Sequence, residues 1–410
     1  MITNKVLSGV APIMDQKKLY DFMLIKAGLL AEGIYFPDEL LNKLREEQKV
    51  TEGTGLFRYG DQKIAPNEIR IITGEKAYRV EVRQKNNPEL TNFSINQEGD
   101  TIRLEDKLSG LSFPVDFPSL PSYMNEVTTS GKPMRNVMKP MGPDFLRLYP
   151  DMRCDYAQGE DRCNFCGGTY QFNVQDITDI LETLQQAKQE MAINGVFMST
   201  GAFTDKERTE FYSEVLNALR SELSDAQIVF ALAPQTNKEH VEMLYKAGSP
   251  NIMLSYNMEA FDKNRWDSEF DLCLGIGKAK TGREFYFEAY DIAVDIGGRG
   301  NHKSNFVIGL ENIDSLKQGA DYLAQRGIFS SGTVYYPTPG SIWETRMKNE
   351  PDFFPLVQEF RDATSRRVFI VDSYLTIGNS AIDQGLNVPW TKESRISGLE
   401  WQAREYLLKR

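Results

Sequence analysis

The chain has 410 residues, which exceeds one average domain and allows a large buried core. Its composition, 41% hydrophobic and 26% charged, is typical of a soluble globular protein, and it has no apolar run of about eighteen residues to cross a membrane. The net charge of −11 argues against nucleic acid as a partner, because such binding relies on basic surface. Only His240 and His302 are present, which disfavours histidine-rich metal sites and most histidine-based acid–base chemistry.

The sequence predicts a cytoplasmic protein. Its N-terminus lacks the charged and then apolar segments of a signal peptide. Four cysteines in a chain of this length do not form a disulfide framework, so a reducing compartment fits.

Residues 1–140 predict an N-terminal α+β accessory region. Amphipathic helices are expected at 15–33 and 37–50. Alternating apolar and polar residues predict half-exposed antiparallel strands at 68–73, 78–83 and 101–104. Five prolines predict an irregular connector over 111–140; they are Pro114, Pro118, Pro121, Pro133 and Pro140.

From residue 141 to 345 the pattern changes to short apolar strands that alternate with helices. The expected strands are 145–149, 196–200, 228–233, 251–256, 305–310 and 332–336. The expected helices are 174–193, 205–224, 237–247, 283–296 and 312–325. This rhythm predicts an α/β fold with a parallel sheet, either a partial (β/α)6 TIM-like barrel or an open sheet. In both, ligands bind at the carboxyl ends of the strands.

The C-terminal extension, residues 346–410, is expected to form one helix, a short strand-like segment at 368–371 and a final helix.

Three of the four cysteines, Cys154, Cys163 and Cys166, lie within thirteen residues, directly after the first expected α/β strand. Three thiolates suit an iron–sulfur cluster or zinc. A closed structural zinc site needs four ligands, whereas a cluster held by three thiolates leaves one metal open to a substrate or cofactor. The alternative is a zinc site completed by Cys273 or a histidine. Since Cys273 is 107 residues beyond Cys166, we interpret it as an ordinary buried residue.

Here the chain resembles the radical S-adenosylmethionine (SAM) superfamily, whose members hold a [4Fe–4S] cluster with three cysteines on the loop after the first barrel strand. An aromatic residue commonly precedes the last cysteine in that family, as Phe165 does here. The usual spacing is C-x3-C-x2-C. This chain has C-x8-C-x2-C, so its first gap is five residues longer. The cysteine spacing therefore does not identify a subfamily.

Further segments after successive expected strands are similar to SAM-binding motifs of biotin- and lipoyl-synthase-like members. Residues 199–202 keep the small residues of a Gly-Gly-Glu-like motif but lack its glutamate, and 255–259 look like an Asn-x-Glu-type segment. Residues 307–311 and 335–340 resemble the glycine-containing and aromatic-Pro-x-Pro-Gly segments on the adenine side. The resemblance implies a SAM pocket formed by Phe165, Thr200, Gly201, Ser255, Asn257, Glu259, Gly309 and Tyr336.

The resemblance also implies the cofactors and the chemistry. A [4Fe–4S] cluster would bind SAM at its fourth iron and, after one-electron reduction by a donor such as flavodoxin or ferredoxin, yield methionine and a 5′-deoxyadenosyl radical. That radical would abstract hydrogen from a small metabolite or natural-product intermediate. No cysteines remain for a second cluster, and no cobalamin-binding histidine motif is visible. Two alternatives stay open: cleavage of another C–S bond of SAM for group transfer, and a non-catalytic zinc-stabilised binding protein.

Several of these residues also have simpler interpretations. Asn257 and Glu259 fit a helix cap with a solvated glutamate, and Glu311 fits a favourable position beside a helix dipole. Tyr336 fits an ordinary core residue. The remaining candidates are read as turn, capping or solvated residues; they are Gly275–Gly277, Gly297–Gly300, Arg265, Arg283 and His302.

Overall fold

The computed structural model describes most of the chain between residues 32 and 334. The described residues are 21, 25–26, 28–29, 32–47, 68–73, 76–82, 84–85, 87–117, 120–141, 144–156, 163–164, 174–203, 205–266, 276–334 and 376–377. Within these ranges no helix has the length and apolar character needed to span a membrane.

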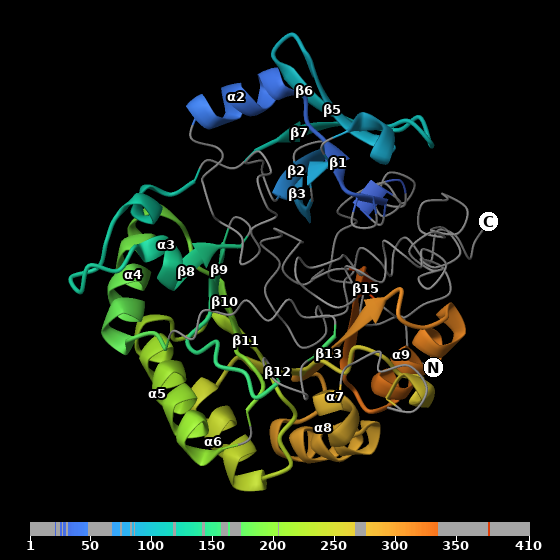
Figure 1. Ribbon diagram of the computed structural model, residues 1–410. Helices are drawn as coiled ribbons and strands as arrows, with labels where there is room; N and C mark the ends of the chain where they lie inside the picture. The colour runs from blue at the N-terminus through green and yellow to red at the C-terminus, as the bar shows by residue number, and fades with distance from the viewer. Residues whose placement is uncertain are drawn as a thin grey trace, which may run out of the picture.

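The central element is a parallel sheet that curls into an arc (Figure 1). Its order is β15-β14-β13-β12-β11-β10-β9-β8, and neighbours from β9 to β15 pair in parallel. This confirms the expected partial barrel. The strands that match the prediction are β9 (Phe145–Leu148), β10 (Gly195–Ser199), β11 (Gln227–Leu232), β12 (Ile252–Tyr256), β13 (His302–Ile308) and β14 (Phe329–Val334).

Two short strands that the sequence did not predict extend this sheet. The strand β8 (Met138–Pro140) pairs antiparallel with β9, and β15 (Thr376–Ile377) pairs with β14. The predicted tail helices and the strand-like 368–371 lie outside the described residues.

Helices cover the convex face of the arc (Figure 1). Four of them begin at a side-chain cap that accepts a backbone N–H: Asp176, Asp205, Asn237 and Asn312. The predicted helices are α4 (Ile177–Glu190), α5 (Lys206–Glu222), α6 (Lys238–Gly248), α8 (Arg283–Gly297) and α9 (Ile313–Gln325). A short helix that was not predicted, α7 (Ile276–Thr281), precedes α8, and a 3₁₀ turn, η3 (Lys263–Trp266), follows β12.

Alternation along the strands separates the two faces of the barrel sheet. Along β13, Ser304 faces outward, where its hydroxyl accepts a hydrogen bond from Tyr290 of α8 at 2.7 Å. The next residue, Asn305, faces inward, and its Oδ1 accepts from Ser331 and Thr333 of β14, each at 3.0 Å. The outer face is therefore an apolar core against helices, and the inner face carries polar groups.

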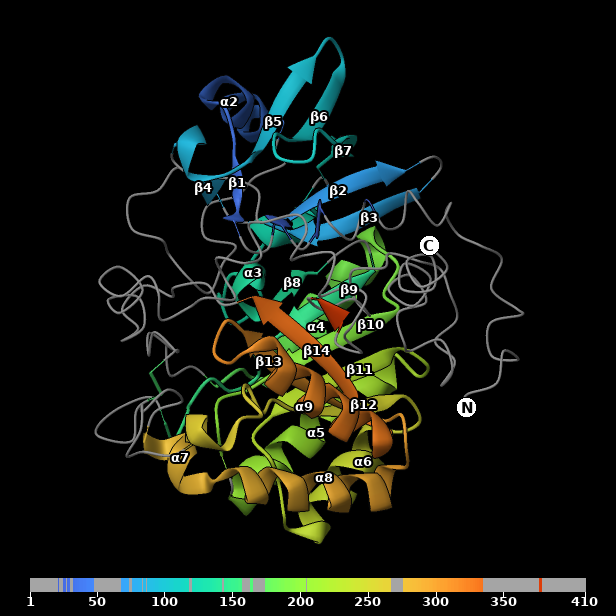
Figure 2. The ribbon, with the colours of Figure 1, turned by 90° about the vertical axis from the view of Figure 1, so that its right-hand side faces the viewer.

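The N-terminal region forms a second sheet, which both views place above the parallel sheet (Figures 1 and 2). Its order is β3-β2-β7-β6-β5-β1-β4. The predicted strands β2, β3 and β6 pair antiparallel as expected, and two of their partners, β5 and β7, were not predicted. The strands are β1 (Ile34–Tyr35), β2 (Glu68–Thr73), β3 (Lys76–Glu81), β4 (Gln84–Lys85), β5 (Phe93–Glu98), β6 (Thr101–Asp106) and β7 (Ser112–Asp116). A 3₁₀ turn, η1 (Pro88–Leu90), leads into β5.

The two predicted N-terminal helices are present in the described residues. The second is α2 (Asp38–Glu46), which buries Leu40, Leu41 and Leu44. Within 15–33, the described residues from 21 to 32 are helical.

The prediction of an irregular connector over 111–140 was wrong. This segment contains β7, the 3₁₀ turn η2 (Ser122–Asn125), the helical turn α3 (Met134–Val137) and β8. The strand β7 tolerates Pro114 because β2 pairs only with Val115 and Asp116, so a missing N–H at Pro114 removes no bond to β2.

One continuous buried core joins the two sheets. It contains Phe36 and Phe117 from the N-terminal region together with Leu146 and Val196 from the barrel. The division at residues 140 and 345 stays a prediction, since the barrel sheet takes one edge strand from each side of those limits.

Candidate cluster and cofactor site

The cysteine loop begins at the carboxyl end of β9, and its first residues are hydrogen-bonded to its last residues. Asp151 forms a bridge with Val174, and the N–H of Gln175 donates to the carbonyl of Pro150 at 2.7 Å. Inside the loop, the N–H of Cys163 donates to the carbonyl of Tyr156 at 3.1 Å, which closes the long first cysteine gap. The base of the loop is therefore fixed. Phe165, Cys166 and Cys273 lie outside the described residues.

The loop after β10 packs directly on Cys154. The N–H of Ala202 donates to Cys154 Sγ at 3.3 Å, and the N–H of Asp155 donates to the carbonyl of Ala202 at 3.0 Å. A Cβ on Gly201 would lie 2.2 Å from the carbonyl oxygen of Arg153 and 2.6 Å from Cys154 Cβ. Gly201 is thus required by the close approach of the two loops.

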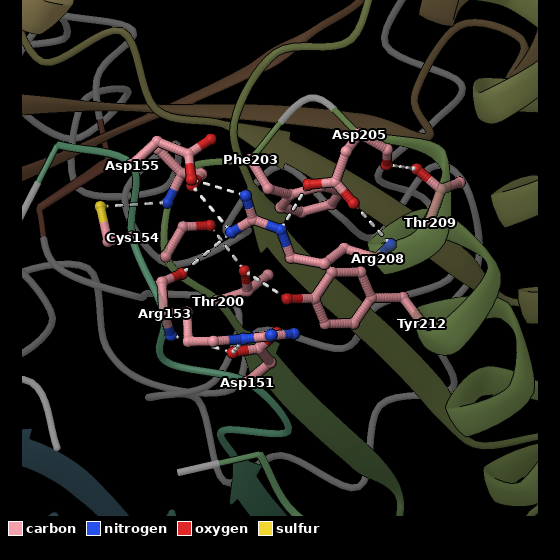
Figure 3. Close-up of polar contacts among 12 residues, drawn as sticks. Asp151, Arg153, Cys154, Asp155, Thr200, Phe203, Asp205, Arg208, Thr209 and Tyr212 are labelled. Atoms are coloured by element: carbon pink, nitrogen blue, oxygen red, sulfur yellow. Dashed lines mark hydrogen bonds and ion pairs between the residues drawn. The ribbon is translucent and has the colours of Figure 1, made fainter. Parts of the chain in front are cut away.

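Arg208 of α5 clamps the cysteine loop to the loop after β10 (Figure 3). Its Nη2 donates to Asp155 Oδ1 and its Nε to Asp205 Oδ2, both at 2.5 Å. The guanidinium also lies 5.5 Å from the ring centroid of Phe203. These charge-assisted bonds fix Asp155, the residue next to Cys154.

A second ion pair stiffens the start of the loop. Arg153 donates to both carboxylate oxygens of Asp151, through Nε at 3.0 Å and Nη2 at 2.7 Å. Asp151 is fully buried, so the pair satisfies a charge that would otherwise be costly.

Thr200 turns toward the helix layer. Its hydroxyl accepts a hydrogen bond from Tyr212 of α5 at 2.9 Å and donates to the carbonyl of Gly201 (Figure 3). Burial raises the pKa of Tyr212, so its hydroxyl stays a donor. In this arrangement Thr200 supports the loop that contacts Cys154.

Polar groups gather where β12 ends. The Ser255 hydroxyl donates to Asn257 Oδ1 at 2.9 Å, and Glu259 has φ of 72°, a conformation rare outside glycine. Glu259 is held there by pairing with β13: its N–H donates to the backbone carbonyl of Asn305 at 2.9 Å, and its own carbonyl accepts the N–H of Val307 at 2.8 Å. Glu259 is buried, so the interpretation as a solvated glutamate was wrong.

Lys278 of α7 connects this strand end to the cysteine loop. Its Nζ donates to Glu259 Oε1 and to the carbonyl of Asn257, each at 3.1 Å. Burial opposes the charge of Lys278, but Glu259, Tyr286 and Cys163 outweigh burial and raise its pKa. Sequence analysis missed Lys278 because the glycines around it indicated only a turn.

Glu311 is a buried structural carboxylate. It accepts backbone N–H groups from Phe261 at 2.8 Å and Asp262 at 2.6 Å, and the hydroxyl of Ser315 at 2.8 Å. Burial raises its pKa although these bonds favour the charged form. The N-cap of α9 is Asn312, so Glu311 fixes the loop after β12 rather than capping a helix. Gly309, with φ of 116°, supplies the turn that leads to it.

The structure does not bring His302 to the site. His302 begins β13, at the opposite end of the strand from Gly309, and lies 2.7 Å through Nδ1 from the Tyr245 hydroxyl. Arg283 donates to the carbonyl of Phe261 at 3.0 Å and lies over Phe261 and Phe287. Arg265 lies in η3.

The expected capping role of the Gly297–Gly300 run is confirmed, because Gly298 is the C-cap of α8 with φ of 79°. Gly275 and Tyr336 lie outside the described residues.

The described donors fit an iron–sulfur cluster. Cys163 is buried and Cys154 half-buried, and both stand at the carboxyl edge of the sheet. The N–H of Ala202 donates to Cys154 Sγ, and the buried Lys278 interacts electrostatically with Cys163. Contacts of this kind orient the thiols that ligate a metal. Within the described ranges no group of three or more His, Cys, Asp or Glu converges on a metal position, and Cys166 is outside those ranges.

The fold is that of a partial barrel whose cysteine loop lies at the carboxyl edge of its parallel sheet. Comparison with known proteins finds radical SAM enzymes among those that this chain resembles. No protein-family model matches the chain. The chain is 21% identical over 245 residues to bacteriochlorophyllide c C-7(1)-hydroxylase of Chlorobaculum limnaeum. That match covers 54% of this chain and 59% of the hydroxylase, which is less than two thirds of the relative's length.

Several solved structures also resemble part of this chain. The FeFe-hydrogenase maturase HydG from Carboxydothermus hydrogenoformans matches with a TM-score of 0.44 and 15% identity, over 59% of this chain and 55% of HydG. The radical SAM methyltransferase TsrM from Kitasatospora setae, with cobalamin and a [4Fe–4S] cluster bound, matches with a TM-score of 0.35 and 10% identity, over 50% of this chain and 39% of TsrM.

Proposed function

We propose that the chain is a radical SAM enzyme whose Cys154, Cys163 and Cys166 hold a [4Fe–4S] cluster. One observation carries the proposal. The loop of Cys154 and Cys163 is fastened at the carboxyl edge of a parallel half-barrel, with an N–H donated to one thiol and a buried cation near the other. That edge is where α/β folds bind ligands.

A bound cluster with SAM supplies a 5′-deoxyadenosyl radical, and the residues of this chain position and protect the site. Gly201 and Arg208 fix the loop that carries Cys154. Ser255 and Asn257 present a hydroxyl and an amide at the end of β12, where the resemblance expects SAM to bind. The pair of Glu259 and Lys278 holds that strand end and α7 together.

The proposed substrate is a small molecule that enters the inner face of the half-barrel, and the proposed electron donor is a flavodoxin or a ferredoxin. The inner face carries Asn305, Ser331 and Thr333 near the carboxyl ends of β13 and β14. Their hydroxyl and amide groups suit the recognition of a polar substrate.

Anaerobic reconstitution with iron and sulfide tests the proposal. The wild-type chain should turn brown, hold about four irons per chain and release 5′-deoxyadenosine from SAM after reduction with dithionite. Cys163→Ala should lose the iron, whereas Cys273→Ala should retain it.

A colourless chain with about one zinc and no SAM turnover would show instead the zinc-stabilised binding protein. Products from another C–S bond of SAM would identify the group-transfer alternative.

A further inference from the structure

The short helix α7 contacts the cysteine loop directly. Tyr156 lies in the long first cysteine gap, and its hydroxyl is 2.7 Å from the hydroxyl of Thr281 of α7. The carbonyl of Tyr156 accepts the N–H of Cys163 at 3.1 Å, so one residue of the gap contacts both α7 and a cysteine. Lys278 lies three residues before Thr281 and therefore shares this face of α7. The long cysteine gap thus contributes a contact that places Lys278 beside the loop.

The charge of Lys278 is buried together with its partners. Its Nζ lies 3.1 Å from Glu259 Oε1 and 5.8 Å from the ring centroid of Tyr286. Lys278, Glu259 and Tyr286 are only 9%, 8% and 3% exposed. Burial opposes the charge of Lys278, but Glu259 and the neighbouring groups outweigh burial and raise its pKa, so the amine stays protonated. A charge in such surroundings acts on its neighbours more strongly than a charge in water.

The pair of Lys278 and Glu259 therefore brings two opposite buried charges to the candidate cluster site. The reduction potential of an iron–sulfur cluster depends on net charge, on hydrogen bonds to sulfur and on solvent exposure. One-electron reduction makes a cluster more negative by one charge, and the electron donor is oxidised in the same step. A buried cation nearby therefore favours the reduced form, and a buried carboxylate favours the oxidised form.

We propose that the buried charges of Lys278 and Glu259 set the reduction potential of the cluster in opposite directions. Lys278 raises the potential through its charge near Cys163, and Glu259 limits the rise. Both are positioning residues in this role, because their charges act on the cluster without contacting the substrate. The inference rests on the proposed function, since it requires a cluster on Cys154, Cys163 and Cys166.

A redox titration of the reconstituted full chain tests the inference. The fraction of reduced cluster, per cluster bound, is measured by EPR spectroscopy at potentials set with dithionite and mediators. In Lys278→Met, the ratio of reduced to oxidised cluster at the wild-type midpoint should fall about ten-fold, a shift of about 59 mV to lower potential. Glu259→Gln should shift the midpoint to higher potential. The double variant Lys278→Met/Glu259→Gln should lie between the two.

Lys206 and Glu210 of α5 provide the matched control. Their ion pair of 3.4 Å has side chains 71% and 51% exposed. Lys206→Met and Glu210→Gln remove the same charges where solvent screens them, so neither should move the midpoint. Opposite shifts of the two buried variants are diagnostic of a charge effect. Damage to the cysteine loop would instead lower the iron content of both variants, with no dependence on the sign of the charge removed.

Equal midpoints in the wild type, Lys278→Met and Glu259→Gln, or shifts of both variants in one direction, would overturn the inference. If Lys278→Met holds no cluster, Glu259→Gln is compared with the double variant. These two proteins differ only at Lys278, and the double variant should have the lower midpoint.

Iron content and release of 5′-deoxyadenosine by the wild type report separately on the proposed function. A wild-type chain that binds no iron would refute both the proposed function and the charge effect. A wild type that holds the cluster and cleaves SAM, with unshifted midpoints in the Lys278 and Glu259 variants, would refute only the charge effect.

Discussion

Lys278 and Glu259 form an ion pair of 3.1 Å in which the two side chains are only 11% and 10% exposed. Lys278 comes from α7 and Glu259 from the segment after β12, so the pair joins two parts of the site that are apart in sequence. Replacing Lys278 by Met removes one charge and leaves the other buried. Such losses cost about 3–5 kcal/mol, and we expect the free energy of unfolding in urea to fall by about that amount.

Lys206 and Glu210 provide the matched control for this pair. They form an ion pair of 3.4 Å on the surface of α5, with side chains 71% and 51% exposed. Lys206→Met should change the free energy of unfolding by less than about 0.5 kcal/mol. Equal changes in the free energy of unfolding for the two substitutions would show that the buried pair contributes no more to stability than the exposed pair.

Gly201→Ala should impair cluster assembly. The added Cβ meets the backbone of Arg153 and Cys154 Cβ at distances that no real Cβ tolerates, so the cysteine loop must move. We expect a clear loss of bound iron after reconstitution. Gly131→Ala is the control, since its φ of 84° makes a substitution strained, but a Cβ there meets no atom within 4 Å. If Gly201→Ala binds iron as the wild type does, the close approach of the two loops is not required.

Arg208→Lys should weaken cluster binding with little loss of fold. Lysine keeps the charge but cannot reach Asp155 and Asp205 together with the geometry of a guanidinium. The rate at which a chelator removes iron should therefore rise, while the thermal midpoint of the apo-protein changes little. Lys206→Ala, two residues earlier on α5, should leave the rate unchanged. An unaltered rate in Arg208→Lys would show that this clamp does not hold the loop.

His302 should make the protein less stable in acid. Burial lowers its pKa from 6.5 to about 4, so the unfolded chain binds the proton first as the pH falls. This contribution to stability is complete above about pH 6.5 and is lost progressively toward about pH 4, by at most about 3 kcal/mol. In His302→Gln, the urea midpoint should depend less on pH between about pH 7 and pH 5. An equal dependence in both proteins would contradict the shift.

Much of the fold was predictable because each element has a local cause. The apolar runs of β9 to β14 reflect burial under helices, and residues such as Asp176 and Asp205 mark helix starts by capping them. The segment 111–140 was misread because proline usually interrupts strands. Pro114 sits in β7 at a position that β2 does not pair, and such a register is decided by strands far away in sequence.

The candidate site was likewise predictable only in part from the sequence. The spacing of Cys154, Cys163 and Cys166 and the order of short motifs are properties of the sequence, and they led to the radical SAM resemblance. Lys278, by contrast, carries no sequence signal. Its role depends on burial beside Glu259 and near Cys163, which only the contact of α7 with the segment after β12 creates.

The sequence alone thus determined the alternation of strands and helices and the soft donor set on the first loop, because periodicity, caps and cysteine spacing are local. Tertiary structure decided which groups share a low-dielectric environment. The Thr200 hydroxyl accepts a hydrogen bond from Tyr212, Glu311 accepts the backbone N–H of Phe261, and Lys139 lies opposite Arg147 in the sheet. Charges and hydrogen bonds across long sequence separations depend on register and packing, and no local pattern encodes them.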